Sequence, residues 1–127
     1  MTSIDLWPND FGVPDENMPV TILRAQASLL YEKTGWKLEG RVSTQADGEN
    51  FVHNFYIVAP ALDDYHFSLF KVRHQIDPYP LSILSDILPK YEYDVATPDE
   101  FIGALKTIFA SEKTKKLIVT LLAQTSS

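Results

Sequence analysis

The spacing of apolar positions along this chain changes twice. From Pro19, apolar residues recur every three or four positions, as on one face of an α-helix, with Leu29 widening the stripe. Thr34-Gly35 is a typical helix end. From Trp36 the spacing shortens to two, which is typical of a strand with one solvent-exposed face. After Thr97 the helical spacing returns, so a β-rich middle lies between two helical ends.

Three strands are predicted in the first part of that middle, over 36–43, 51–59 and 65–74. The first two are joined by a turn at 46–50, which contains the Asp-Gly pair favoured in hairpins. The third is expected to place Phe67 and Leu69 on one face and Phe70 and Val72 on the other. Since the last two strands are apolar on both faces, we expect a second covering layer, such as the N-terminal arm, or a subunit interface.

Residues 81–88 fit either of two structures. The leucine spacing allows a helix over the whole segment, while the short apolar run at 81–84 favours a strand, which is the interpretation we adopt. Residues 91–95 alternate between tyrosine and acidic side chains, and their charges suit the edge of a sheet.

A capping box marks the start of the helical end. Thr97 can cap the helix, Pro98 suits its first position, and Glu100 can reach back to the cap's own N–H. The helix should run to about Ala110, and Ser111 can cap another. The chain is therefore predicted to be a single α+β domain over 1–127, with an N-terminal helix, an antiparallel meander of four or five strands and a C-terminal helix pair packed on the sheet.

Composition excludes several functions. The chain has no cysteine, so thiolate chemistry, disulfides and cysteine-bound metals are excluded. Its net charge of −6 disfavours nucleic acid as a partner. We see no signal peptide and no apolar run long enough for a membrane span, so a cytoplasmic location is expected. Residues 1–18 should form an irregular arm that Trp7 and Phe11 pin onto the domain.

Few residues suggest chemistry. A hairpin should bring His53 beside Lys71, Val72 or Arg73, and a slip of register would pair it with His74, with Asp77 as a third metal ligand. Solvated or strand-bound histidines are the favoured interpretation. Asp63-Asp64 lies in a predicted turn, where aspartate is a structural choice. The sequence predicts no catalytic residue, no cofactor and no metal.

Aromatic and acidic residues gather near the predicted edge strand. Tyrosine is favoured at interfaces because its ring is rigid and its hydroxyl polar. The candidate partner-binding residues are Tyr79, Tyr91, Glu92, Tyr93 and Asp94. The alternative places the tyrosines against the helices, as part of the core. Lys113, Lys115 and Lys116 open the last helix against its dipole. A solvated face is the favoured explanation for them, and a phosphate or an acidic partner is the alternative.

These observations favour a non-catalytic protein-binding module, an acidic adaptor or inhibitor-type protein with a protein partner that is basic in character. One alternative is a small-molecule binder or enzyme. Its pocket would lie between helices and sheet, lined by Trp36, Phe55 and Phe67, with His53 or Asp63 at its mouth. The other is a homodimer formed through the sheet edge or the last helix, without chemistry.

Overall fold

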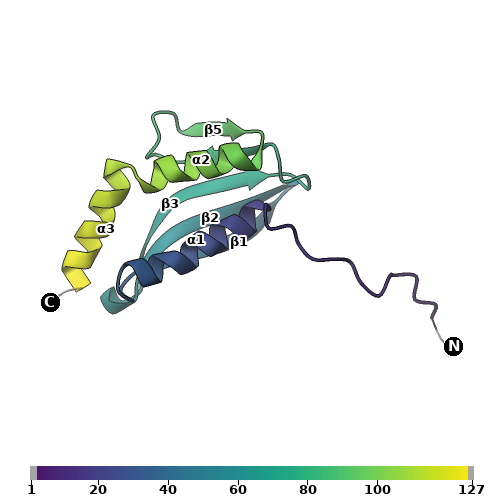
Figure 1. The fold of residues 1–127 in the computed structure, drawn as a ribbon, viewed down its shortest axis with the longest axis horizontal. Helices are drawn as coiled ribbons and strands as arrows, with labels where there is room; N and C mark the ends of the chain where they lie inside the picture. Colours follow the sequence, from purple (N-terminus) through teal and green to yellow (C-terminus); the bar gives the residue numbers. More distant parts are fainter. Residues whose placement is uncertain (1–2, 126–127) are drawn as a thin grey trace.

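Three helices cover one face of a single five-stranded sheet (Figure 1). The computed structural model describes residues 3–125, so the first two residues of the predicted arm and the last two of the chain lie outside the described part. The elements are α1 (Pro19–Lys33), β1 (Glu39–Asp47), β2 (Asn50–Ala59), the 3-10 turn η1 (Pro60–Leu62), β3 (Tyr65–His74), β4 (Leu81–Leu84), β5 (Glu92–Val95), α2 (Pro98–Phe109) and α3 (Glu112–Thr125).

Every strand pairs antiparallel with its neighbour in sequence, in the order β1-β2-β3-β4-β5. The fold is therefore the predicted α+β arrangement of an N-terminal helix, a meander sheet and two C-terminal helices. Residues 81–84 form a strand, and β5 lies at the edge of the sheet, as predicted. Among the described helices, none is long and apolar enough to cross a membrane.

The core lies between the helices and the sheet, because each helix turns its apolar stripe toward the same sheet face. Leu23 of α1, Phe55 of β2, Phe70 of β3, and Phe101 and Ile108 of α2 are almost completely buried there. The rings of Phe55 and Phe70 stack with their centroids 5.2 Å apart. α1 and α2 are thereby held over different parts of one continuous apolar floor.

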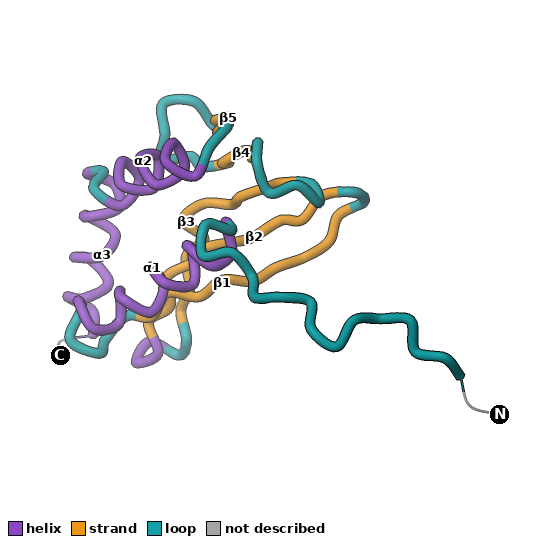
Figure 2. Tube along the Cα trace, turned by 45° about the vertical axis from the view of Figure 1, so that its right-hand side comes forward, coloured by secondary structure: helices purple, strands orange, loops and turns teal. Residues whose placement is uncertain are grey.

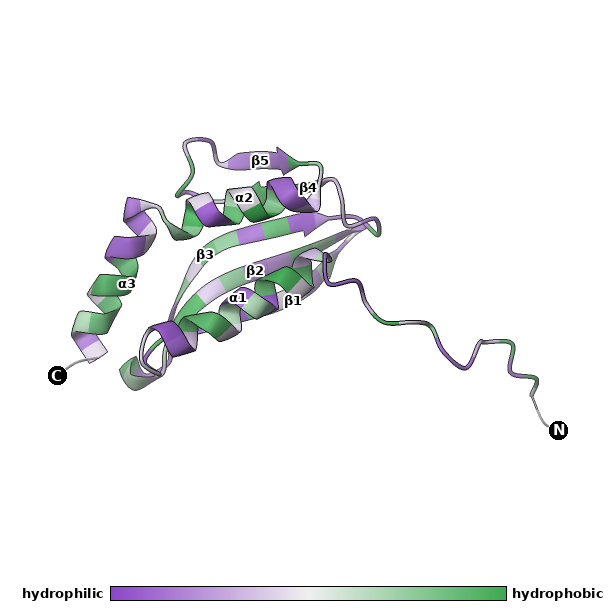
Figure 3. Ribbon diagram, in the orientation of Figure 1, coloured by the Kyte–Doolittle hydropathy of each residue, from purple (hydrophilic) through white to green (hydrophobic). Residues whose placement is uncertain are grey.

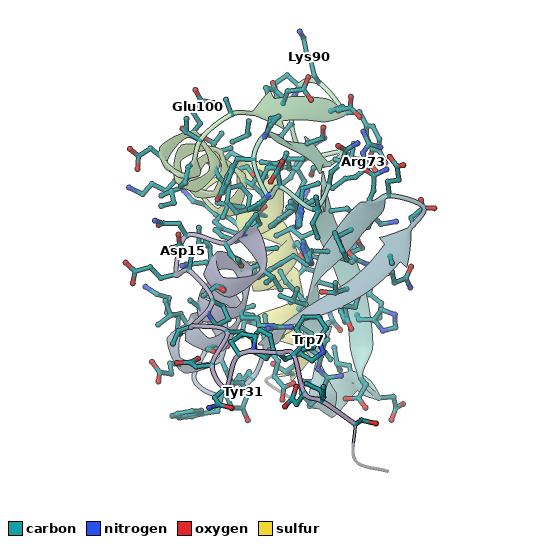
Figure 4. The ribbon with its side chains drawn as sticks, turned by 90° about the vertical axis from the view of Figure 1, so that its right-hand side faces the viewer. Trp7, Asp15, Tyr31, Arg73, Lys90 and Glu100 are labelled. Carbon is teal, nitrogen blue, oxygen red and sulfur yellow. The ribbon has the colours of Figure 1, made fainter. Side chains whose placement is uncertain are left out.

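The opposite face of the sheet is polar, which corrects the expectation of a second covering layer. Ser68 donates to the Asn54 side chain over 2.6 Å, and Arg73 forms an ion pair with Glu92 at 2.9 Å. Figure 4 shows Asp15 and Glu100 on the helix side of the sheet and Arg73 on the other side. Hydrogen-bonded polar side chains can remain in water, so this face needs no cover.

A β-bulge in β3 explains why the predicted faces of that strand are wrong. Phe55 lies opposite Phe70, and Ile57, two residues further along β2, lies opposite Phe67. The register shifts between those pairs, so β3 carries one extra residue. Directly paired residues share a face, so Phe67 and Phe70 both lie on the helix side rather than on opposite sides.

The first strand and turn also differ in detail from the prediction. Trp36 has a φ of 66° and packs edge-on against Tyr31 at 5.1 Å, so it belongs to the loop after α1, and β1 begins three residues later. The hairpin turn is tighter than predicted, because Asp47 pairs directly with Asn50. Gly48 occupies the first central position with a φ of 61°, a conformation that favours glycine.

The capping box at α2 is present with one change. The Thr97 hydroxyl accepts a hydrogen bond from the Glu100 amide over 3.2 Å, as predicted. Glu100 Oε2 accepts from the amide of Ala96 at 2.9 Å, not from the amide of Thr97 itself. Two otherwise unpaired amides at the junction between β5 and α2 are still satisfied.

Replacing Thr97 with alanine should lower the free energy of unfolding by about 1 kcal/mol, because the amide of Glu100 loses its acceptor. Urea denaturation followed by circular dichroism measures this change. Thr97→Ser retains a hydroxyl and should stay close to the parent protein. Equal losses in the two variants would contradict the capping role.

The arm, residues 3–18, extends away from the rest of the molecule in two views (Figures 1 and 2). Trp7 is 74% exposed and Phe11 76% exposed, and their rings contact each other with centroids 5.8 Å apart. The expectation that they pin the arm onto the domain is wrong. The chain leaves α1 in a direction that carries both rings beyond any apolar surface of the same molecule.

Candidate functional site

An apolar concavity lies between α1 and α3, above the sheet. We call it the interhelical groove, and its volume is about 400 Å³. The apolar lining comes from α1, the sheet, α2 and α3: Leu29, Leu30, Phe55, Ile57, Leu69, Phe109, Ile118 and Leu122. Leu29 is 43% exposed, so solvent reaches the groove. In Figure 3 both α1 and α3 carry apolar residues along part of their length.

The groove exists because α1 and α3 diverge. α1 packs closely on β1, where an added Cβ on Gly40 would lie 2.6 Å from Ala27 Cα. α3 turns away from α2 after Ser111, whose hydroxyl accepts from the Thr114 amide at 3.2 Å. The two helices therefore cover different parts of the sheet and leave Phe55 and Leu69 between them.

Both threonines of the groove lining are hydrogen-bonded within the protein itself. Thr34 Oγ1 donates to the Leu30 carbonyl at 2.9 Å and accepts from the Leu38 amide at 3.1 Å. Thr114 Oγ1 donates to the Ile108 carbonyl at 2.7 Å. Among the described residues, the side chains of Gln26 and Lys33 in the lining have no hydrogen-bonding or ionic partner.

The chemistry of this lining suits binding rather than catalysis. It contains no aspartate, glutamate, histidine or serine, so it offers no general acid or base other than Lys33. Of the residues predicted for a pocket between helices and sheet, the groove uses Phe55. Trp36 and Phe67 lie outside the lining, and both are partly exposed elsewhere.

The histidine pair that the sequence allowed only with a slip of register, and did not favour, is present at a different place from the groove. His53 lies opposite Val72, and its Nε2 is 2.7 Å from His74 Nε2, diagonally across the same pair of strands. No register slip is needed, because diagonal neighbours on one face are within reach of long side chains. His53 is 3% exposed.

Hydrogen bonding fixes how this pair shares its protons. His74 Nδ1 donates to the Gln75 carbonyl at 2.6 Å, so in neutral His74 the Nε2 atom accepts from His53. His53 Nδ1 then accepts from the Thr44 hydroxyl at 2.9 Å. Burial, followed by the charges of His74 and Arg24, lowers the pKa of His53 from 6.5 to about 4.

The pair is a hydrogen bond rather than a metal site. Two nitrogen ligands of a tetrahedral zinc lie about 3.3 Å apart, further than the 2.7 Å observed here. Within residues 3–125, no group of three or more metal-ligating side chains is gathered, and Asp77 does not join the histidines.

The five candidate partner-binding residues are divided among different surfaces. Tyr91 is 60% exposed in the loop before β5. Tyr93 is half-buried opposite Ile83, on the helix side of the sheet. Glu92 and Asp94 lie on the polar face, where they are bonded to Arg73 and to Ser82, the latter at 2.9 Å.

Tyr79 has a structural contact of its own. Its hydroxyl donates to the Asn17 carbonyl at 2.8 Å, and its ring packs edge-on against Phe101 at 6.3 Å. Burial, followed by the charge of Asp15, raises its pKa to about 12. Tyr79 thus ties the end of the arm to the body of the molecule.

Asp63 and Asp64 border a shallow polar depression on the uncovered face of the sheet. Both have left-handed φ angles, 55° and 57°. His66 contacts the ring of Tyr56 there, with centroids 5.8 Å apart. Most of the surrounding side chains are exposed or half-buried, and some are bonded to one another, so this depression is open to solvent and presents no enclosed reaction chamber.

The sequence did not identify the interhelical groove as a site. A signal was present in Leu29, which widens the apolar stripe of α1 beyond what one neighbour covers. Periodicity shows which residues are apolar, but not that two helices diverge. Comparison with protein-family models, with curated proteins and with solved structures finds no match for this chain.

Proposed function

We propose that this chain is a non-catalytic protein-binding module whose main contact surface is the interhelical groove. The supporting observation is the lining itself, an apolar concavity in which both threonine hydroxyls are already hydrogen-bonded. Such a surface gains free energy by burying apolar side chains and offers little to a polar substrate. A segment of a partner protein can supply those side chains.

Charge around the groove favours an acidic segment. Lys33 lies in the lining without an ionic partner within residues 3–125. Lys113, Lys115 and Lys116 are exposed on α3, the helix that forms the opposite wall. Carboxylates next to the apolar anchors of a partner would meet the ammonium group of Lys33, and the α3 lysines add positive charge nearby on the same helix. Such charges speed association and fix orientation more than they add affinity.

A basic partner fits a second surface, the edge of the sheet at β5. This edge strand has one unpaired side. The ring of Tyr91 is exposed in the loop before it, and Glu92 and Asp94 are exposed on the polar face of the strand, where they are bonded to Arg73 and Ser82. An aromatic side chain flanked by acids suits a lysine- or arginine-rich segment.

The groove is tested with two synthetic peptides of equal length that share two leucines and a tryptophan, one flanked by aspartates and the other by lysines. Amide shifts of the labelled full chain should move around Leu29, Leu69 and Ile118, with the acidic peptide bound about tenfold more tightly at low salt. Leu29→Glu should abolish these shifts. Ile102→Glu, at a similarly exposed leucine-sized position on α2 outside the groove, should not.

The outcome also separates the two surfaces. Preference for the lysine peptide, with shifts confined to β5 and lost in Tyr91→Ala, would move the binding function to the sheet edge. The titration is also run with a Trp7→Ala, Phe11→Ala chain, whose arm has lost its aromatic side chains. If neither peptide shifts the amide signals of either surface in both chains at millimolar concentration, the proposed function is contradicted.

A further inference from the structure

We propose that the interhelical groove receives the arm of a second copy of this chain, so that two copies exchange arms in a symmetric dimer. This inference rests on the proposed function, since it names the partner of the same groove. It uses three observations: the chemistry of the arm, the charge of the groove and the direction in which the arm leaves the molecule.

The arm exposes apolar side chains along its described length. Ile4, Leu6 and Val13 are each more than four-fifths exposed, and Trp7 and Phe11 about three-quarters. Monomeric proteins rarely present such a row of large apolar side chains to water, and its presence marks an interaction site. Aromatic anchors of this kind dominate binding energies when a partner buries them.

Local hydrogen bonds order the arm before it binds. Side chains of Asp5, Asp10 and Asp15 each accept from the amide two residues later, at 3.0, 2.8 and 2.9 Å. These turns are local to the arm and require no contact with the body of the molecule. A segment that is already shaped loses less conformational entropy on docking, which favours binding.

Charges on the arm and the groove are complementary. The arm carries four acidic residues, Asp5, Asp10, Asp15 and Glu16, and has no lysine or arginine. The groove lining contains Lys33, while the exposed lysines of α3 border a separate hollow on the same helix. Carboxylates that follow the apolar anchors would therefore lie near ammonium groups, although the whole chain is acidic.

The direction of the arm favours a second copy over the arm's own groove. The arm leaves from the first residue of α1, while the groove is lined by the second half of that helix, from Gln26 to Thr34. Its exit is held by the Tyr79–Asn17 hydrogen bond and a turn in which the Met18 amide donates to the Asp15 carbonyl at 3.1 Å. Met18 is also extended, as the residue before a proline prefers.

Docking into the same molecule would require the arm, which extends away from the body in both views, to turn back along α1. Docking into a neighbour requires no such reversal. The chain between Trp7 and Pro19 can extend about 40 Å, enough to reach a facing molecule. A two-fold dimer fills both grooves with the same contact and leaves no arm or groove free. It therefore does not grow into a larger assembly.

The test uses the full chain with Trp36→Phe, which leaves Trp7 as its one tryptophan. Light scattering gives the mass, and tryptophan emission reports whether Trp7 is buried, both over a range of concentrations. We expect the mass to rise to that of a dimer while the emission moves to shorter wavelength in parallel.

Two added substitutions identify the groove. Lys33→Glu, on an exposed position that leaves the core untouched, should raise the dissociation constant of the dimer roughly tenfold or more by opposing the carboxylates of the arm. Leu29→Glu should abolish both signals, and Ile102→Glu should leave them unchanged. Circular dichroism checks that each variant is folded.

Three results would overturn the inference. A monomer with an exposed Trp7 at all concentrations would show that no arm is docked. A monomer with a buried Trp7 would show that the arm lies in its own groove. A dimer that is insensitive to Leu29→Glu and Lys33→Glu would have another interface. The proposed function is judged separately, from the peptide titration with the Trp7→Ala, Phe11→Ala chain, whose groove the arm cannot fill.

Discussion

Replacing Gly40 with valine is expected to lower the free energy of unfolding by about 3 kcal/mol, the upper range for overpacking. A Cβ at this position would lie 2.6 Å from Ala27 Cα and 2.9 Å from Ala27 Cβ. The first of these atoms is backbone, so a side-chain rotation cannot relieve the clash. α1 and β1 would have to move apart along their contact, which also opens the wall of the interhelical groove.

Gly103 provides the matched control. It lies within α2, and nothing described lies within 4 Å of an added Cβ. Gly103→Ala should therefore stabilise the protein by about 0.5–1 kcal/mol, because alanine is the better helix former. Urea denaturation of both variants measures the difference. A Gly40→Val protein as stable as its parent would show that α1 is not held against β1 at this distance.

Acidification from pH 6.5 to 4 should remove about 3 kcal/mol of stability through His53 alone, the free energy that corresponds to lowering its pKa from 6.5 to about 4. Below pH 6.5 the unfolded chain binds a proton at this imidazole, and the folded chain does not bind it until about pH 4. The unfolded state therefore gains protons first. The contribution of His53 is complete above 6.5, falls with pH across this window and is lost below it.

The contribution of His53 is isolated by difference. His53→Gln keeps a neutral hydrogen-bonding side chain, so its free energy of unfolding should depend less steeply on pH between 4 and 6.5. Carboxylates titrate in both proteins and cancel in the comparison. His66→Gln, at an exposed histidine outside the pair, should retain the steeper dependence. Identical curves for His53→Gln and its parent would show that the ring is not kept neutral by its surroundings.

Much of the fold could be read from local signals in the sequence. Gly35 has the left-handed conformation expected after a helix end, and the Ser111 hydroxyl accepts from the amide of Thr114 as a helix cap should. Each of these signals involves only a few neighbouring residues, so the residue types alone are enough to recognise it. The predicted strand order followed, since short turns join each strand to the next.

Features that depend on the third dimension could not be read. The bulge that turns Phe67 and Phe70 to one face leaves no glycine or proline in β3 to mark it. The uncovered face of the sheet looked apolar in the sequence because its residues include the apolar and buried Val58. The serines and charged residues that dominate this face are spread over several strands, so the sequence of one strand does not show them together. The His53–His74 contact required the diagonal geometry of a twisted sheet, beyond simple pairing.

The meander has a consequence for how the chain acquires its structure. Each strand pairs with the strand next to it in sequence, so the sheet can grow one hairpin at a time and closes only short loops. Chains with such local contacts fold faster than those that must first join distant segments. α1 and α3 form two walls of the groove on the same face of the sheet, although they come from opposite ends of the chain. The walls of the groove are therefore expected to be completed last, when the sheet beneath them has already formed.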